Sequence, residues 1–342
     1  MPSIFAVSVR SSPTSPTKAG DKLKNRKLIS QIAVLLAIVL LFSLFHLSIY
    51  MIFTKRCLSA ESEAMQAKSI ELGAFLPFSD DTKIVKIKSD LQLSGDLPII
   101  DGAAALYPVF SAFVYANYPE SAIEFDGTNF TERSLLQYTN TRGAYKRIVD
   151  GDIDIAICVA PSDEQLAYAK EKGVELEFVP IGKEAFVFLV NTNNTVDDLT
   201  VQQVKDIYAG KYTNWKELGG PNRLISPLIR NEGSGSQSAL LNFLGTSEIP
   251  PDYDSFLGSA LGFSFRYYVE GIVENGGVKM LALNGVYPSK ENISNGSYPI
   301  INEIYAVYRK DNANPNVKLL VDWMLSEQGQ QIVEESGYCR VQ

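Results

Sequence analysis

A chain of 342 residues can bury one or two full-sized hydrophobic cores, and 46% apolar against 20% charged residues is typical of a globular protein with an added apolar segment. The net charge of −8 is uneven: residues 1–57 carry eight Lys/Arg and one acid, and the rest of the chain carries 23 Lys/Arg and 38 acids. So acidic a body excludes the basic face that nucleic-acid binding needs, and we expect no nucleic-acid partner. A bound anion must be held by local geometry, because the overall field repels it.

Histidine and cysteine usage excludes several kinds of catalytic and metal site. The one histidine, His46, lies in an apolar N-terminal run, so the body has none for a Ser-His-Asp arrangement or a His-containing zinc site. The cysteines, Cys57, Cys158 and Cys339, show no CxxC spacing. We expect no metal, no cofactor and no enzymatic activity. Cys158 reads as a core residue, and a disulfide between Cys158 and Cys339 stays open for an oxidising compartment.

The N-terminal region predicts a membrane anchor. Residues 28–53 contain no charged side chain at neutral pH, and 26 residues at about 1.5 Å each are ample for a bilayer core of about 30 Å. Six Lys and Arg residues precede this run and two follow it closely, which places the N-terminus in the cytoplasm and the body outside. The alternative is a signal peptide cleaved after Ala60, although the run is longer than usual for one. We predict a cytoplasmic tail at 1–27, a transmembrane anchor at 28–53 and a stalk at 54–82.

The first half of the body alternates strand-like and helix-like runs, which predicts α/β layers. In chain order, the expected elements are a short apolar run at 97–100, a helix with Leu106, Phe110, Phe113 and Val114 on its buried face, a strand at 123–125, a helix at 144–149, a buried strand at 153–159, a helix at 164–172, an alternating stretch at 174–178 and a buried strand at 185–190.

The second half continues the alternation. A helix at 201–209 is well delimited, because Thr200 and Gln203 form a capping box and Gly210 follows its end. The other expected elements are a strand at 224–229, a helix carrying Leu240, Phe243 and Leu244 and stopped by Gly245, a strand at 304–307, and a final helix carrying Val317, Leu320, Val321 and Met324. Trp215 and Trp323 are expected in the core. Together these elements predict a two-lobed α/β protein.

One loop, residues 229–238 (IRNEGSGSQS), leads from an apolar strand into a helix and suits an anion. Its glycines let the backbone approach a ligand closely, and Ser234 and Ser236 add hydroxyl donors. The following helix presents free N–H groups, and Arg230 offers a planar fork of donors. The alternative is an ordinary Gly/Ser turn with a capping serine and a surface arginine. Nucleophile-elbow and Walker patterns do not match, since Gln237 replaces the last glycine of GxSxG and no GK[ST] follows.

The run NEGSGSQSALLNFLG at 231–245 resembles the anion-binding loop of the phosphate-binding proteins of ABC phosphate importers (PstS-like, periplasmic binding protein type II family). Further similar stretches follow in family order: DGAAALYPVFSAF at 101, DIDIAICVAPSDEQLA at 152, LTVQQVKDIYAGKYTNWKELGGP at 199, GFSFRYYV at 262 and NVKLLVDWMLSEQGQQIVEESGY at 316. The resemblance covers roughly 95–342, and the stretches at 199–221 and 230–245 are specific in combination.

The resemblance implies two lobes that close on an anion at a hinge of two crossing strands, with lobe 1 at 83–182 and 303–342 and lobe 2 at 183–302. It implies an extracytoplasmic solute-binding protein that captures inorganic phosphate or a similar tetrahedral oxyanion, delivers it to an ABC permease in the membrane, and acts as a monomer. The ligand-binding residues that it assigns are Ala103, Ala104, Ala105, Thr141, Arg142, Gly143, Arg230, Ser234, Gly235 and Ser236.

Two departures from the family pattern leave the preferred oxyanion open. Ala103–Ala105 offer only backbone N–H groups where members commonly place Ser or Thr. Phosphate-specific members also carry a buried aspartate just after the strand that matches 153–159, and this chain continues there with Val159-Ala160-Pro161. An anion sensor or scaffold without a transport role is the alternative on the same fold. Arg142 is either a second donor or an exposed arginine, and Tyr267 and Tyr268 contact the ligand or serve packing.

Overall fold

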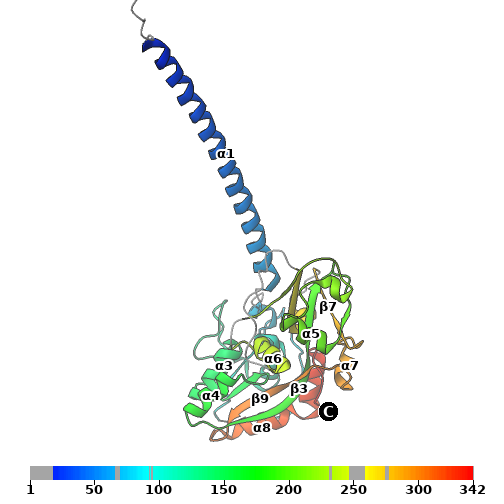
Figure 1. Cartoon of the computed structure of the whole chain (residues 1–342). Coiled ribbons are helices and arrows are strands. Elements are labelled where there is room, and N and C mark those ends of the chain that lie inside the picture. Colours follow the sequence, from blue (N-terminus) through cyan, green and yellow to red (C-terminus); the bar gives the residue numbers. More distant parts are fainter. Residues whose placement is uncertain are drawn as a thin grey trace, which may run out of the picture. The chain divides into compact units, whose positions relative to one another are not determined.

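The computed structural model describes residues 18–65, 70–91, 93, 95–230, 233–245, 259–273 and 277–341, with side chains described outside 18–25, 52–65 and 271–273. The chain divides into two compact units, Met1–Gln66 and Ala67–Gln342 (Figure 1). The second unit is the body, and it contains all of the predicted site residues.

The first unit is built on one long helix, α1 (Lys18–Met65). Its stretch Arg26–Met51 spans 26 residues with a mean hydropathy of 2.7 and lacks buried side chains. A helix of this length and composition can cross a membrane or serve as a signal sequence. The helix extends past both ends of the predicted anchor at 28–53, and the predicted stalk is helical as far as Met65. Residues 1–17 of the predicted tail lie outside the described residues.

The described body contains eight α-helices. They are α2 (Tyr107–Asn117), α3 (Asn140–Asp150), α4 (Asp163–Glu171), α5 (Val201–Tyr208), α6 (Gly235–Leu244), α7 (Lys290–Ser294), α8 (Pro315–Met324) and α9 (Glu327–Glu335). Short 3-10 turns lie at Leu72–Phe75, Ala104–Leu106, Glu120–Ala122 and Trp215–Leu218, and a π-helical segment spans Tyr268–Val273.

The strands alternate with these helices, as the sequence predicts for α/β layers. They are β1 (Ile100–Gly102), β2 (Ile155–Cys158), β3 (Leu176–Asn191), β4 (Asp198–Leu199), β5 (Ile225–Pro227), β6 (Ser259–Phe265), β7 (Val278–Met280), β8 (Ala282–Leu283) and β9 (Ile301–Arg309). Seven of them form one sheet in the order β1-β2-β9-β3-β6-β5, with β7 also paired to β3, and β4 pairs with β8 separately.

The long strand β3 connects the two halves of the body. Its first part, as far as Ala185, pairs antiparallel with β9, and its second part pairs with β6 and β7. In Figure 1 β3 (green) runs beside β9 (orange). One buried apolar cluster includes Ile181 of β3 and Ile304 of β9, whereas a second includes Ala185 of β3 and has Ile301 of β9 packed against it. Both strands therefore pass from one hydrophobic core to the other, which gives the two-lobed α/β fold.

Capping residues explain several helix boundaries. The capping box at Thr200 and Gln203 is present as predicted, and helix α5 ends just before Ala209 and Gly210. Gly245 ends α6 at a φ of 73°, in the left-handed region that favours glycine. Trp215 and Trp323 are buried as predicted. The local sequence therefore set these boundaries correctly.

Four predicted elements differ from the structure. Residues 176–178 of the first run and all of the run at 185–190 belong to one strand, because a bulge between Pro180 and Gly182 carries the chain across without ending it. The predicted strand at 123–125 forms only an isolated bridge from Phe125 to Phe130, since the chain turns back at once. The helix with Val317 is not the final one, because a further helix, α9, is capped by Ser326.

Candidate functional site

Three helix starts line one cavity of about 370 Å³ in the body. They are the turn at 103–106 before α2, the first residues of α3, and the loop that enters α6. The full lining is Ala103, Ala104, Ala105, Leu106, Asn140, Thr141, Arg142, Val159, Arg230, Ser234, Gly235, Ser236, Phe265 and Tyr268. The first N–H groups of a helix have no partner within it, so three such starts supply donors and positive dipole ends to one volume.

Nine of the ten residues predicted from the resemblance line this cavity, and Gly143 does not. Instead, Gly143 packs against the start of its own helix: a Cβ there would lie 2.5 Å from Thr139 Oγ1. Its lack of a side chain lets Thr139 fold over α3. The structure therefore gives Gly143 a place beside the cavity wall.

The buried carboxylate of Asp101 holds the first two helix starts together. Its Oδ1 accepts from the Gly102 and Thr139 N–H groups at 2.7 and 2.8 Å. Its Oδ2 accepts from Thr139 Oγ1 at 2.6 Å and from Arg147 at 2.8 Å. Asp101 is fully buried, and this set of donors satisfies it. The carboxylate thus links the end of β1 to the start of α3, and both segments bring residues to the cavity.

The start of α3 faces the cavity through an unusual backbone conformation. Asn140 has a φ of 61°, a left-handed value that asparagine tolerates better than most residues. Tyr138 donates a hydrogen bond to Asn140 Oδ1 at 2.9 Å. Thr141 follows and is only 5% exposed, so its hydroxyl is presented from a buried position. Asn140 and Thr141 both belong to the cavity lining.

The loop into α6 is braced by Gln237. Its Oε1 accepts from the Arg230 N–H at 2.7 Å, and its own N–H donates to Ser234 Oγ at 3.2 Å. Ser234 is therefore the N-cap of α6, and its hydroxyl proton can still be donated to a ligand. A Cβ at Gly235 would lie 2.9 Å from Thr141 Oγ1, so glycine permits close approach of the loop to α3. Asn231 and Glu232 of the loop lie outside the described residues.

The two arginines of the lining differ in environment. Burial lowers the pKa of Arg230, and nearby Tyr268 acts in the opposite direction; the guanidinium stays charged at neutral pH. Burial also raises the pKa of Tyr268, which keeps its phenol protonated and able to donate. The Arg142 side chain is 70% exposed, and its Nη2 lies 3.7 Å from Glu164 Oε1. Arg230 is the better placed of the two for a fixed contact with an anion.

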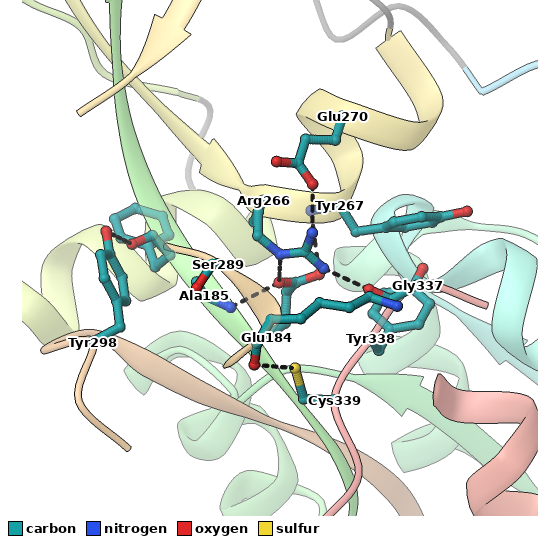
Figure 2. Close-up of polar contacts among 12 residues, drawn as sticks. Glu184, Ala185, Arg266, Tyr267, Glu270, Ser289, Tyr298, Gly337, Tyr338 and Cys339 are labelled. Atoms are coloured by element: carbon teal, nitrogen blue, oxygen red, sulfur yellow. Dashed lines mark hydrogen bonds and ion pairs between the residues drawn. The ribbon is translucent and has the colours of Figure 1, made fainter. Parts of the chain in front are cut away.

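A buried ion pair lies where β3 passes between the two cores (Figure 2). Glu184 of β3 is 1% exposed, and its Oε1 lies 3.3 Å from Nε of Arg266, which follows β6. Arg266 also contacts Glu270 and donates to the Gly337 carbonyl. Figure 2 shows these contacts converging on one guanidinium. In the sequence, Arg266 directly follows the lining residue Phe265 and comes two positions before the lining residue Tyr268. Its contact with Glu184 therefore connects this part of the cavity wall to β3.

Cys158 and Cys339 are both buried free thiols, in different apolar clusters, so the disulfide left open by the sequence is not formed. Cys158 is a core residue, as predicted. The side chain of Cys57 lies outside the described residues. Among the residues that the structure describes, there is no group of three or more His, Cys, Asp or Glu side chains that could hold a metal ion.

Sequence reasoning missed several residues of the cavity and its support. Asn140 lines the cavity without belonging to any stretch that carries the resemblance. Phe265 and Val159 lie in such stretches but were not assigned to the ligand, and they line the cavity too. The role of Asp101 depends on Arg147 and on Thr139, which lies 38 positions along the chain. The only sequence signal for this role was an Asp-Gly step directly after an apolar strand. Tyr268 lines the cavity, whereas Tyr267 packs on Tyr338.

Comparison with known proteins gives consistent similarities. A family model described as a PBP superfamily domain matches residues 99–328. The phosphate-binding protein PstS of Bacillus subtilis is 24% identical over 263 residues, which are 74% of this chain and 83% of that protein. The phosphate-binding protein PstS of Borreliella burgdorferi is 26% identical over 175 residues, and the match spans 45% of this chain but only 62% of that relative's length.

Two solved structures share the fold. One, from Clostridium perfringens, is described as a phosphate ABC transporter substrate-binding protein with bound phosphate. It is 26% identical, with a TM-score of 0.54 over 71% of this chain and 98% of that chain. The other, an ABC-type phosphate transport receptor from Vibrio cholerae, is 19% identical, with a TM-score of 0.51 over 70% of this chain and 98% of that one. The second similarity concerns the fold alone.

Proposed function

Because the chain belongs to the PBP superfamily, we propose that it is a membrane-anchored, extracytoplasmic solute-binding protein that captures inorganic phosphate or a similar tetrahedral oxyanion for an ABC importer. The observation that carries this proposal is the convergence of three helix starts and Arg230 on one cavity. Helix N-termini with an arginine fork are a common physical solution for binding an oxyanion. The similarity to phosphate-binding proteins supports phosphate as the first candidate.

In this proposal each residue has a defined part. Arg230 supplies charge and paired donors, and Ser234, Ser236 and Thr141 supply hydroxyl groups. The backbone N–H groups of Gly235, Ala104 and Ala105 complete the shell, and Arg142 is an outer donor. The predicted N–H donor of Ala103 is not available, because it already donates to the Ile157 carbonyl at 2.9 Å. Gly143 acts through packing. The protein binds and releases its ligand without transforming it, acts as a monomer, and passes the anion to a membrane permease.

We further propose the arrangement of the whole chain. Lobe 1 comprises 83–182 and 303–342, and lobe 2 comprises 183–302; the division of the apolar clusters near Ile181, Ala185 and Ile304 supports these boundaries. Residues 28–53 are an uncleaved single-pass anchor with the N-terminus in the cytoplasm. The excess of Lys and Arg before the apolar run supports this orientation.

Replacing Arg230 by Ala tests the proposal. A hydrogen bond to a charged group contributes about 1.5–3 kcal/mol, so we expect the change to weaken phosphate binding at least about tenfold, or roughly 1.4 kcal/mol. The measurement is calorimetric titration of the full chain in detergent micelles, freed of phosphate by dialysis, with phosphate and with sulfate. Arg223→Ala, at an exposed arginine outside the cavity lining, is the matched control. Unchanged affinity in Arg230→Ala would remove Arg230 from the site, and silence of the wild type towards both anions would favour a sensor or scaffold.

A further inference from the structure

The cavity is larger than a bare tetrahedral anion requires. Its volume is about 370 Å³, whereas a water molecule takes about 30 Å³ in the liquid. A tetrahedral oxyanion has one central atom and four oxygens, and it displaces only a few waters of that volume. The cavity also falls within the range of about 300–1,000 Å³ that is usual for pockets of organic ligands. An anion held by the donors therefore leaves room beside it.

Much of the wall beside that room is hydrocarbon. The apolar residues of the lining are Ala103, Ala104, Ala105, Leu106, Val159 and Phe265. These residues come from the turn at 103–106 (the first turn), from the end of β2 and from β6, so the apolar wall is built from both halves of the body. An apolar substituent on the anion gains from contact with such a wall, because both surfaces leave water.

Val159 brings this wall to the start of α6. A Cβ built on Gly235 would lie 3.2 Å from Val159 Cγ2 and 2.9 Å from Thr141 Oγ1. The valine methyl thus lies beside the first residue of α6, next to a hydroxyl donor. Val159 is 3% exposed, and its carbonyl accepts a hydrogen bond from Tyr145, so its position is fixed. An anion oxygen facing this methyl loses water and gains no hydrogen bond, whereas a methyl or methylene group there loses nothing.

The charges of the lining favour oxygens without protons. The described part of the lining contains Arg142 and Arg230 and no carboxylate. Asp101 is fully buried behind the first turn, with its oxygens taken up by backbone, Thr139 and Arg147 donors. Inorganic phosphate near neutral pH keeps at least one O–H group. A phosphate monoester has its second pKa near 6 and is then a dianion without one.

We infer that the site also accepts tetrahedral oxyanions that carry one small apolar substituent, the chemistry shared by alkylphosphonates and phosphate monoesters. The inference rests on the proposed function, because the same donors hold the phosphoryl oxygens. Arg230, Ser234, Ser236 and the start of α6 bind the three terminal oxygens, which share the two negative charges of the dianion. The substituent lies against Val159 and the alanines of the first turn.

Calorimetric titration of the full chain in detergent micelles at about pH 8 tests this inference. The probes are inorganic phosphate, methylphosphonate, ethyl phosphate and sulfate. We expect methylphosphonate or ethyl phosphate to bind within about tenfold of inorganic phosphate, and the tighter of the two distinguishes a phosphonate ligand from a monoester. If phosphate binds and both substituted anions are more than tenfold weaker, this inference is overturned and the proposed function stands. If no probe binds, the proposed function fails as well.

Variants at Val159 test whether this residue forms the apolar wall that contacts the substituent. Val159→Thr keeps the volume nearly unchanged but replaces a methyl group with a hydroxyl, and Val159→Asp adds a carboxylate. Both variants should weaken the binding of the substituted anions at least about tenfold relative to the binding of inorganic phosphate, with the larger effect in Val159→Asp. Val196→Thr, at a similarly buried valine of the same apolar cluster outside the lining, is the control and should leave the ratio unchanged. An unchanged ratio in folded Val159→Thr, verified by its thermal melt, would refute the assignment.

Discussion

Replacing Glu184 by Gln tests whether burial, or the nearby guanidinium, decides the charge of this carboxyl. Glu184 is 1% exposed, and Arg266 Nε lies 3.3 Å from its Oε1. Burial nevertheless raises the pKa of Glu184 from 4.5 to about 7, against the opposing effects of Arg266 and of the Ala185 and Tyr267 N–H groups. The loss of hydration thus outweighs the attraction of one buried cation.

The magnitude follows from linkage between protonation and folding. At about 1.36 kcal/mol per pKa unit, the step from 4.5 to about 7 corresponds to roughly 3 kcal/mol. Between these two values the folded protein keeps a proton that the unfolded chain has already released. Raising the pH therefore favours unfolding, so the free energy of unfolding falls across this window and levels off above it. Glutamine cannot titrate, and the Glu184→Gln variant should lose this part of the pH dependence.

The assay is urea denaturation of the full chain in detergent micelles, followed by the fluorescence of the buried Trp215 and Trp323. Between about pH 5 and about pH 8, the unfolding free energy of Glu184→Gln should rise by roughly 2–3 kcal/mol relative to wild type, because other titrating groups cancel in the difference. Glu120→Gln, at an exposed glutamate, should give a flat difference. If the Glu184→Gln difference is also flat, burial does not control this carboxyl and the reasoning is refuted.

Two further substitutions probe backbone close approach and helix capping. In Gly102→Ala the new Cβ would lie 2.5 Å from the Ile157 carbonyl oxygen, so we expect about 1–3 kcal/mol of destabilisation in urea unfolding, and weaker phosphate binding because the turn at 103–106 shifts. The control is Gly73→Ala, whose Cβ meets nothing within 4 Å and which should be near neutral. Equal effects of the two substitutions would contradict the steric argument. Thr200→Ala removes the oxygen that accepts from the Gln203 N–H at 3.0 Å, and it should lower the unfolding free energy by about 0.5–2 kcal/mol without changing anion affinity, so a loss of binding would count against a purely local role.

Elements with local signals were predicted well. The capping box and the glycine after α5 lie within ten residues of one another, and the structure shows both. Where a signal was ambiguous, tertiary context decided. Pro180 and Gly182 look like an interruption between two strands, yet pairing with β9 carries one strand through them with a bulge. The apolar residues at 123–125 have the composition of a strand but lack a continuous partner beyond one bridge.

The candidate site likewise has parts that the local sequence indicates and parts that depend on tertiary contacts. The loop at 229–238 could be recognised as an anion cradle because glycine, serine and arginine act there within a few residues. The brace from Gln237 to the Arg230 N–H and the role of Asp101 could not be recognised, since each depends on where the folded chain places its partner. Val159 lies in a stretch that carries the family resemblance, but only the folded chain places it in the cavity lining beside Gly235.

The sequence by itself determined the apolar helix near the N-terminus, the alternation of strands and helices, and the donors of the α6 loop, because hydropathy, periodicity and capping depend on neighbouring residues. The tertiary structure alone decided that three helix starts meet around one cavity, that an ion pair is buried at the crossing strand, and that hydrocarbon faces the donors. These features arise from strand pairing and core packing between residues far apart in the chain, and such contacts are not encoded in any short stretch of it.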